Sequence, residues 1–91
     1  MKYYVYIIVS IAKKKTTSYV GYTNNIKKRL VLHNTNKGAK FTKGRKWQLA
    51  YYKVYKSKVS AMKNEYILKK NKKVRNQIKS DFLNNDKIQK N

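Results

Sequence analysis

The chain has 91 residues and no cysteine, so it suits one small domain, and neither a disulfide framework nor a thiolate metal site is open to it. It carries 24 lysines and arginines against 3 acidic residues, a net charge of +21 that is spread along the whole chain. Such a basic body favours a polyanionic partner, above all nucleic acid. The alternative is a lysine-rich composition set by genomic base content, which would imply no binding role.

Residues 3–9, with the sequence YYVYIIV, are almost all β-branched or aromatic, which predicts a strand covered on both faces. Lys2 and the apolar run after it imitate a signal peptide, but the run is rich in tyrosine, lacks an A-x-A cleavage pattern and leads directly into a lysine cluster. No segment approaches the roughly 18 apolar residues that span a bilayer. We therefore expect a cytoplasmic protein, nucleoid-associated if bacterial, with no membrane partner.

A lysine-rich loop through Thr17 separates this strand from a second one over residues 18–22, and the pair predicts a β-hairpin with a long loop. Thr23 or Asn24 follows, and a short side-chain oxygen at either position can cap a helix over about residues 26–34.

The second half of the chain predicts a third strand over residues 47–54 and a helix over about 58–70 with Ser57 as its cap. Another helix is expected over about 71–83, since apolar residues recur there at helical spacing. The order β-β-α-β-α-α predicts an α/β protein of the α+β type, in which helices flank a small three-stranded, largely antiparallel sheet. We expect a single domain over residues 1–84 and a polar, frayed tail over residues 85–91.

Arg29 and His33 lie within about a third of a turn of Ile26 and Leu30 on the first predicted helix, at roughly 100° per residue. Both polar side chains therefore belong to the apolar stripe that should face the sheet. The alternative is an ordinary helix, in which the arginine reaches along the surface to solvent and the single histidine is a satisfied residue at the core edge.

Tyr6 and Tyr19 lie on the two strands of the predicted hairpin, so both phenols can point to the face that this helix covers. Strand tyrosines are usually packing residues, and this chain has nine tyrosines. Gly21 is more specific, because a glycine inside a strand often marks the close approach of another group or a ligand.

Glu65 is the only acidic residue before Asp81, and on its predicted helix it shares a face with Ala61 and Leu68. An ordinary surface glutamate would pair with Lys69 for a few tenths of a kcal/mol. A hard divalent cation requires oxygen ligands, however, and Glu65 is the one candidate side chain on the predicted core for holding Mg²⁺ or Mn²⁺.

Basic residues gather between the first helix and the third strand, where two glycines let backbone amides approach phosphates. The cluster predicts sequence-independent binding to a nucleic-acid backbone through Lys37, Lys40, Lys43, Arg45 and Lys46. Phe41 and Trp47 can each stack on an unpaired base, although core packing is the favoured role of Trp47.

Five elements in this order resemble a known family. Tyr4-Val5-Tyr6 and Tyr19-Val20-Gly21, followed by Arg29, His33 and Glu65, are similar to the motifs of the GIY-YIG nuclease domain, and the similarity covers about residues 3–83. The stretches YVGYTNNIKKRLVLHN and KGAKFTKGRKWQLAYY are especially similar to the small single-domain bacterial members and to the structure-specific endonuclease branch. Tyr4 stands where the first motif has its glycine, so that motif rests on Tyr6.

The resemblance implies a metal-dependent endonuclease that hydrolyses DNA phosphodiester bonds, with a preference for structure over sequence and a role in repair or recombination; RNA stays open as a substrate. The implied roles fit the residue types: Glu65 holds the cation, Arg29 binds the phosphate, and His33 is a further donor or assists proton transfer. Tyr19 takes the proton of the attacking water, which Tyr6 orients.

Supporting contacts are expected from Lys70 and Asn71. The main alternative is a basic nucleic-acid-binding protein without catalytic activity, and a second is an RNA-associated structural protein.

Overall fold

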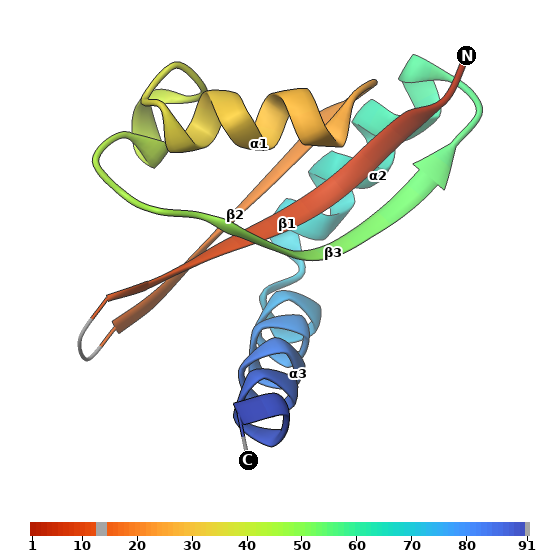
Figure 1. The fold of residues 1–91 in the computed structure, drawn as a ribbon. Helices are drawn as coiled ribbons and strands as arrows, with labels where there is room; N and C mark the ends of the chain where they lie inside the picture. Colours follow the sequence, from red (N-terminus) through yellow and green to blue (C-terminus); the bar gives the residue numbers. More distant parts are fainter. Residues whose placement is uncertain (13–14, 91) are drawn as a thin grey trace.

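The computed structural model describes residues 1–12 and 15–90, without the side chains of residues 85–90. The predicted order of strands and helices is confirmed, and a short 3₁₀ helix, η1, is added in the basic loop (Figure 1). The elements are β1 (Tyr3–Ala12), β2 (Lys15–Thr23), α1 (Ile26–Asn34), η1 (Lys40–Thr42), β3 (Gln48–Tyr55), α2 (Lys58–Lys70) and α3 (Lys72–Lys90).

The three strands form one antiparallel sheet in the order β2-β1-β3. The central strand β1 is the most apolar of the three, and its residues from Val5 to Val9 are all buried, as expected for a strand covered on both faces. Edge strand β2 pairs with β1 in a register that sets Tyr6 opposite Gly21 and Ile8 opposite Tyr19. Tyr6 and Tyr19 are therefore diagonal neighbours on one face of the sheet.

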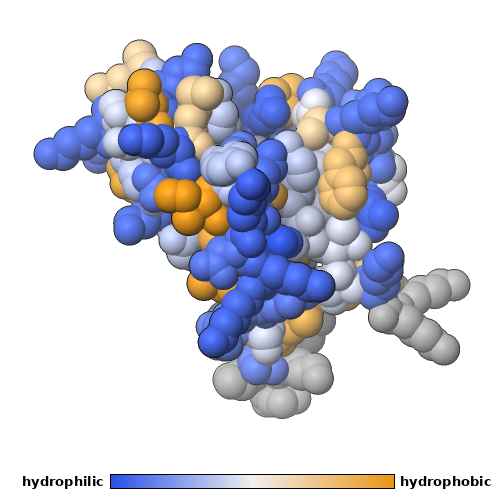
Figure 2. Space-filling view, turned by 180° about the vertical axis from the view of Figure 1, so that it is seen from behind, coloured by the Kyte–Doolittle hydropathy of each residue, from blue (hydrophilic) through white to orange (hydrophobic). Residues whose placement is uncertain are grey.

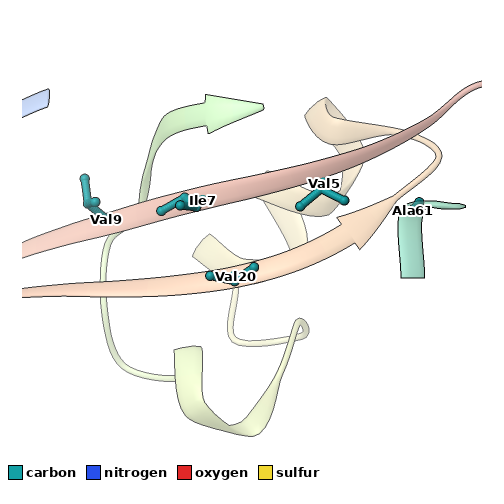
Figure 3. Packing of buried hydrophobic residues seen from close by; sticks show 5 residues of the cluster. All are labelled: Val5, Ile7, Val9, Val20 and Ala61. Atoms are coloured by element: carbon teal, nitrogen blue, oxygen red, sulfur yellow. The ribbon is translucent and has the colours of Figure 1, made fainter. Parts of the chain in front are cut away.

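Side-chain alternation along β1 divides the core into two clusters. On one face, Val5, Ile7 and Val9 pack with Val20 and Ala61 (Figure 3). Further side chains of α2 and α3 complete this cluster. On the other face, Tyr6 and Ile8 pack with Trp47, Tyr19, Leu49 and the α1 residue Leu30. The sheet thus lies between α1 and the α2–α3 pair (Figure 1).

Helix capping follows the sequence with one correction. Asn25, and neither Thr23 nor Asn24, caps α1, because its Oδ1 accepts a hydrogen bond of 3.0 Å from the Lys28 amide. Thr23 stands two residues earlier, at the end of β2, and its hydroxyl accepts from the Asn25 amide. Ser57 caps α2 as predicted, with Oγ accepting from the Ser60 amide at 3.1 Å.

Some boundaries differ from the predicted ones. The hairpin strands are longer, because main-chain pairing continues past the apolar residues to Ala12 and Lys15, so the predicted loop through Thr17 is wrong. Helix α3 begins at Lys72 and its backbone continues to Lys90, beyond the predicted end at residue 83. Beyond this backbone trace, the predicted fraying of residues 85–91 lies outside the residues that the structure describes.

Hydrophilic side chains dominate the surface seen from behind, with smaller hydrophobic patches between them (Figure 2). Within the described residues, no helix is both long and apolar enough to span a membrane.

Candidate active site

The phenol of Tyr6 passes over the backbone of Gly21 toward the free edge of β2. A Cβ atom built on Gly21 would lie 2.6 Å from Tyr6 Cζ and would also collide with the phenol oxygen. Any larger residue at this position would displace the ring, so the glycine of the Tyr19-Val20-Gly21 motif is required by the position of Tyr6. The expectation of a close approach at Gly21 is confirmed.

A chain of hydrogen bonds leads from Tyr6 into the protein and fixes the tautomer of His33. The hydroxyl of Thr42 donates its one proton to the Ala39 carbonyl at 2.9 Å. Thr42 Oγ1 must therefore accept from His33 Nδ1, which lies 2.9 Å away. His33 Nε2 then carries no proton and accepts from the Tyr6 hydroxyl at 2.8 Å.

Both titratable members of this chain are shifted toward their neutral forms. Burial raises the pKa of Tyr6 above 10.0 against the lowering effect of Arg29, and the neighbouring Tyr19 and Glu65 raise it further. Burial also lowers the pKa of His33 below 6.5, and the positive charge of Arg29 lowers it in the same direction. At neutral pH, His33 is therefore an acceptor for the proton of Tyr6.

The histidine is held from several sides. A Cβ atom on Gly38 would collide with the imidazole ring, so the glycine backbone packs directly against it. Trp47 Nε1 donates to the Thr42 carbonyl at 2.9 Å, which ties η1 to the start of β3. Asn34 completes the support, because its side chain accepts from the Trp47 amide at 2.6 Å and donates to the Trp47 carbonyl at 3.1 Å.

His33 is 0% exposed and both of its nitrogens are occupied, so it has no donor for a substrate phosphate. Of the two roles expected for it, only proton transfer is compatible with this geometry. Tyr19 packs beside it, with ring centroids 5.2 Å apart, and is less buried than Tyr6. The sequence therefore brings Tyr6, Tyr19 and His33 together as predicted, with His33 behind the two phenols.

Arg29 lies one turn before His33 on α1 and opens onto a groove of about 430 Å³. Its Nε atom is buried and has no hydrogen-bond partner among the described residues. A buried guanidinium nitrogen without a partner is costly unless an anion completes its hydrogen bonds. This arrangement agrees with the expected role of Arg29 as a phosphate ligand.

Glu65 comes from α2, on the opposite face of the sheet, and meets the phenol side at the edge of β2. Its charge is close enough to Tyr6 to raise the pKa of that phenol. Glu65 also lines a groove of about 710 Å³ with Tyr22, and Tyr22 lines the groove of Arg29 as well. Tyr22 therefore stands between the arginine and the glutamate at the end of β2.

Glu65 can hold one divalent cation only if water and the substrate supply the other ligands. Its Oε1 atom lies 3.7 Å from Lys69 Nζ, a loose pair that leaves the carboxylate available. No group of three or more His, Cys, Asp and Glu side chains occurs among the residues that the structure describes. Glu65 is thus a single protein carboxylate, and water and substrate phosphate oxygens would have to complete the shell of Mg²⁺ or Mn²⁺.

The residues predicted to bind the nucleic-acid backbone are all exposed. Five lie in the loop from α1 to β3, namely Lys37, Lys40, Lys43, Arg45 and Lys46. Lys70 lies at the end of α2 with its Nζ 4.5 Å from the centroid of the Tyr66 ring. Asn71 has a structural role, because its Oδ1 accepts from the Val74 amide at 3.1 Å and caps α3.

Four contributors were missed by the sequence analysis: Tyr22, Asn34, Gly38 as a ring contact, and Thr42. Tyr22 follows the Tyr19-Val20-Gly21 motif directly, and this position next to the motif could have identified it as a site residue. Thr42 carries no such signal, because a threonine in a basic loop has many possible roles and its contact with His33 depends on how the loop folds back.

The chain is similar over nearly its whole length to known proteins. The model of the GIY-YIG catalytic domain matches residues 2–79. A UPF0213 protein of Streptococcus pyogenes serotype M3 is 42% identical, over 99% of this chain and 95% of its own length, and one of serotype M5 is equally similar. The solution NMR structure of a UPF0213 protein from Bacillus halodurans is 35% identical, with a TM-score of 0.51 over 88% of this chain and 84% of that one.

The family match spans all five elements from which the site is assembled: Tyr6, Tyr19, Arg29, His33 and Glu65. The chain belongs to the GIY-YIG catalytic domain family, which is a family of nucleases.

Proposed function

We propose that this protein is a metal-dependent endonuclease that hydrolyses phosphodiester bonds in DNA, with a preference for structure over sequence. The observation that carries the proposal is the hydrogen bond from Tyr6 to His33, which couples a buried phenol beside Arg29 to a buried proton acceptor. A satisfied buried polar chain can also serve to rigidify a core, and what favours catalysis here is that the chain begins at a phenol next to Arg29 and Glu65. We further propose a role in repair or recombination, in the cytoplasm or at the nucleoid.

We assign the water-activating role to Tyr6 and the neighbouring, orienting role to Tyr19, the reverse of the assignment suggested by the resemblance. Tyr6 is 2% exposed and donates its hydroxyl proton to His33, so a water molecule admitted with the substrate would meet the lone pairs of its oxygen, next to Arg29. Its raised pKa disfavours a standing phenolate, so the water proton moves to Tyr6 as the phenol proton moves to His33 Nε2. The new P–O bond forms to the water oxygen, the ester P–O bond breaks, and the leaving oxygen takes up a proton from solvent.

Arg29 binds the non-bridging oxygens of the phosphate and offsets the charge that develops on them. A divalent cation held by Glu65 would supply Lewis-acid stabilisation at the leaving oxygen. The exposed cations of the α1–β3 loop hold the backbone on either side of the scissile phosphate without reading sequence.

The test is cleavage of labelled linear and branched DNAs by the full chain, in Mg²⁺, in Mn²⁺ and in EDTA. We expect strand scission with either cation, highest on branched substrates, and none in EDTA. DNA binding in EDTA should persist and weaken steeply with salt, with a slope of about −0.9 in log K for each phosphate contacted. Binding without cleavage of any substrate would favour the alternative, a non-catalytic nucleic-acid-binding protein.

A further inference from the structure

We propose that the groove beside Tyr19 binds one unpaired nucleotide, with Phe41 as the platform for its base. The inference rests on the proposed nuclease function, and it defines the substrate as a strand with an unstacked base next to the cleaved bond. The groove has a volume of about 350 Å³, which suits a single nucleotide. The groove is lined by Ser18, Tyr19, Val20, Phe41, Lys69 and Arg75.

Phe41 is a fixed and exposed aromatic surface. It lies in η1 with 55% of its area accessible, although phenylalanine is usually buried in proteins. Its ring stacks on Tyr19 with a centroid distance of 6.1 Å and an angle of 20°, and it also contacts the buried Trp47 ring at 6.5 Å. These inner rings set the orientation of Phe41, so little entropy is lost when a base stacks on it.

A cation lies over this aromatic surface. The guanidinium carbon of Arg45 is 5.9 Å from the centroid of Phe41, and its Nη1 atom donates to Thr17 Oγ1 at 3.1 Å. The guanidinium is exposed and held by this one bond, so it can move aside and stack on the outer face of an incoming base. Aromatic rings and arginine planes are the groups on which proteins stack unpaired bases.

The opposite side of the groove is positively charged. Lys69 and Arg75 line it, and the Nε atom of Arg75 is buried without a hydrogen-bond partner among the described residues. Lys69 has a carboxylate neighbour in Glu65, whose Oε1 atom lies 3.7 Å from Lys69 Nζ. A phosphate would complete the hydrogen bonds of Arg75, which favours a nucleotide over an apolar peptide as the occupant.

Stacking of Phe41 on Tyr19 also fixes the position of the nucleotide in the reaction. A base stacked on Phe41 is separated from Tyr19 by the Phe41 ring, and Tyr19 in turn contacts His33. The phosphate of this nucleotide would therefore lie close to the scissile phosphate. A continuous duplex keeps its bases stacked and would leave this site empty. Strands with unpaired bases, whether single or at a branch, would fill it.

The test measures binding of the full chain in EDTA to a short thymidine oligonucleotide and to an abasic strand with the same number of phosphates. Phe41→Ala should weaken binding of the thymidine strand about 5- to 100-fold and leave the abasic strand unaffected. Phe41→Trp should restore or exceed wild-type affinity. Arg75→Gln should weaken binding of both strands equally, because it removes a phosphate contact.

Tyr52→Ala is the matched control, since Tyr52 is 54% exposed on the far edge strand β3 and should leave both affinities unchanged. The proposal is overturned if Phe41→Ala leaves the thymidine strand bound as in the wild type, or if it weakens both strands equally while circular dichroism shows a native fold. Because the assay needs neither metal nor cleavage, failure of the nuclease proposal alone would not alter its result.

Discussion

The two faces of the sheet bury different kinds of side chain, although β1 contributes to both. Toward α2 and α3, the buried residues of β1 are aliphatic and need only close packing. Toward α1, the protein buries Tyr6, His33 and Thr42, whose polar groups would be costly without hydrogen bonds. Each of these groups is satisfied by the next. Within β1, the first face provides stability and the second face carries the phenol of the site, while Glu65 joins the site from α2 at the edge of β2.

The largest effect is expected from Tyr6→Phe on the polar face. The change keeps the ring over Gly21 but removes the oxygen that accepts the water proton, so the single-turnover cleavage rate should fall about 10²- to 10⁴-fold. The unpaired His33 nitrogen should cost about 1–3 kcal/mol of folding stability. A normal rate in Tyr6→Phe would return the water-activating role to Tyr19, and Tyr19→Phe is the variant to compare.

Ile7→Ala breaks the apolar face instead. Ile7 is 0% exposed, so its truncation should lower the free energy of unfolding by about 2–5 kcal/mol in urea denaturation. The cleavage rate per folded molecule should stay at the wild-type value, because no catalytic group lies on this face of β1. A large loss of rate in the folded variant would show that the two faces are not separable.

Thr42→Val tests the inner end of the hydrogen-bond chain. Valine has nearly the same shape but cannot accept from His33 Nδ1, so the tautomer that accepts the Tyr6 proton is no longer enforced. We expect a fall in cleavage rate of about 10-fold and a loss of about 1–3 kcal/mol in stability. Thr42→Ser, which keeps the hydroxyl, should restore both, and equal defects in the two variants would reject the positioning role.

The smallest effect concerns pH. Since the pKa of His33 is lowered in the folded protein, the unfolded chain binds the proton first as the pH falls below 6.5. The stability contribution of neutral His33 is therefore present above 6.5 and is lost as the pH falls through the lowered folded value. Thermal unfolding across this range should show a slope that His33→Gln removes, and an identical slope in that variant would assign it to other groups.

Much of the fold is predictable because local signals agree with one another. The β-branched run of β1, the Ser57 cap and the helical spacing after Asn71 each predict an element that the structure confirms. The length of the hairpin is not predictable in this way, because main-chain hydrogen bonds extend β1 and β2 as far as Ala12 and Lys15, two residue types that are depleted in strands. The cap of α1 was misplaced by one residue, since three adjacent polar residues offer nearly equivalent oxygens.

The candidate site is predictable only in part. Motif spacing places Tyr6, Tyr19 and His33 together, because strands and a helix of known period carry them. The burial of His33 and its bond to Thr42 depend on an irregular loop, which no periodicity describes. Glu65 lies on the opposite face of the sheet from the phenols, and it comes near Tyr6 only because both reach the edge strand β2.

The most direct test of the account is the single-turnover cleavage rate of Glu65→Gln in Mg²⁺, with DNA affinity measured in parallel. We predict cleavage at background, weak rescue by excess Mn²⁺, and DNA binding that persists or tightens slightly, because a negative charge is removed from a basic surface. Asp81→Asn is the matched control, since it removes an exposed carboxylate from α3 and should cleave normally. Full activity of Glu65→Gln would contradict the proposed metal ligand and, with it, the mechanism assigned to this chain.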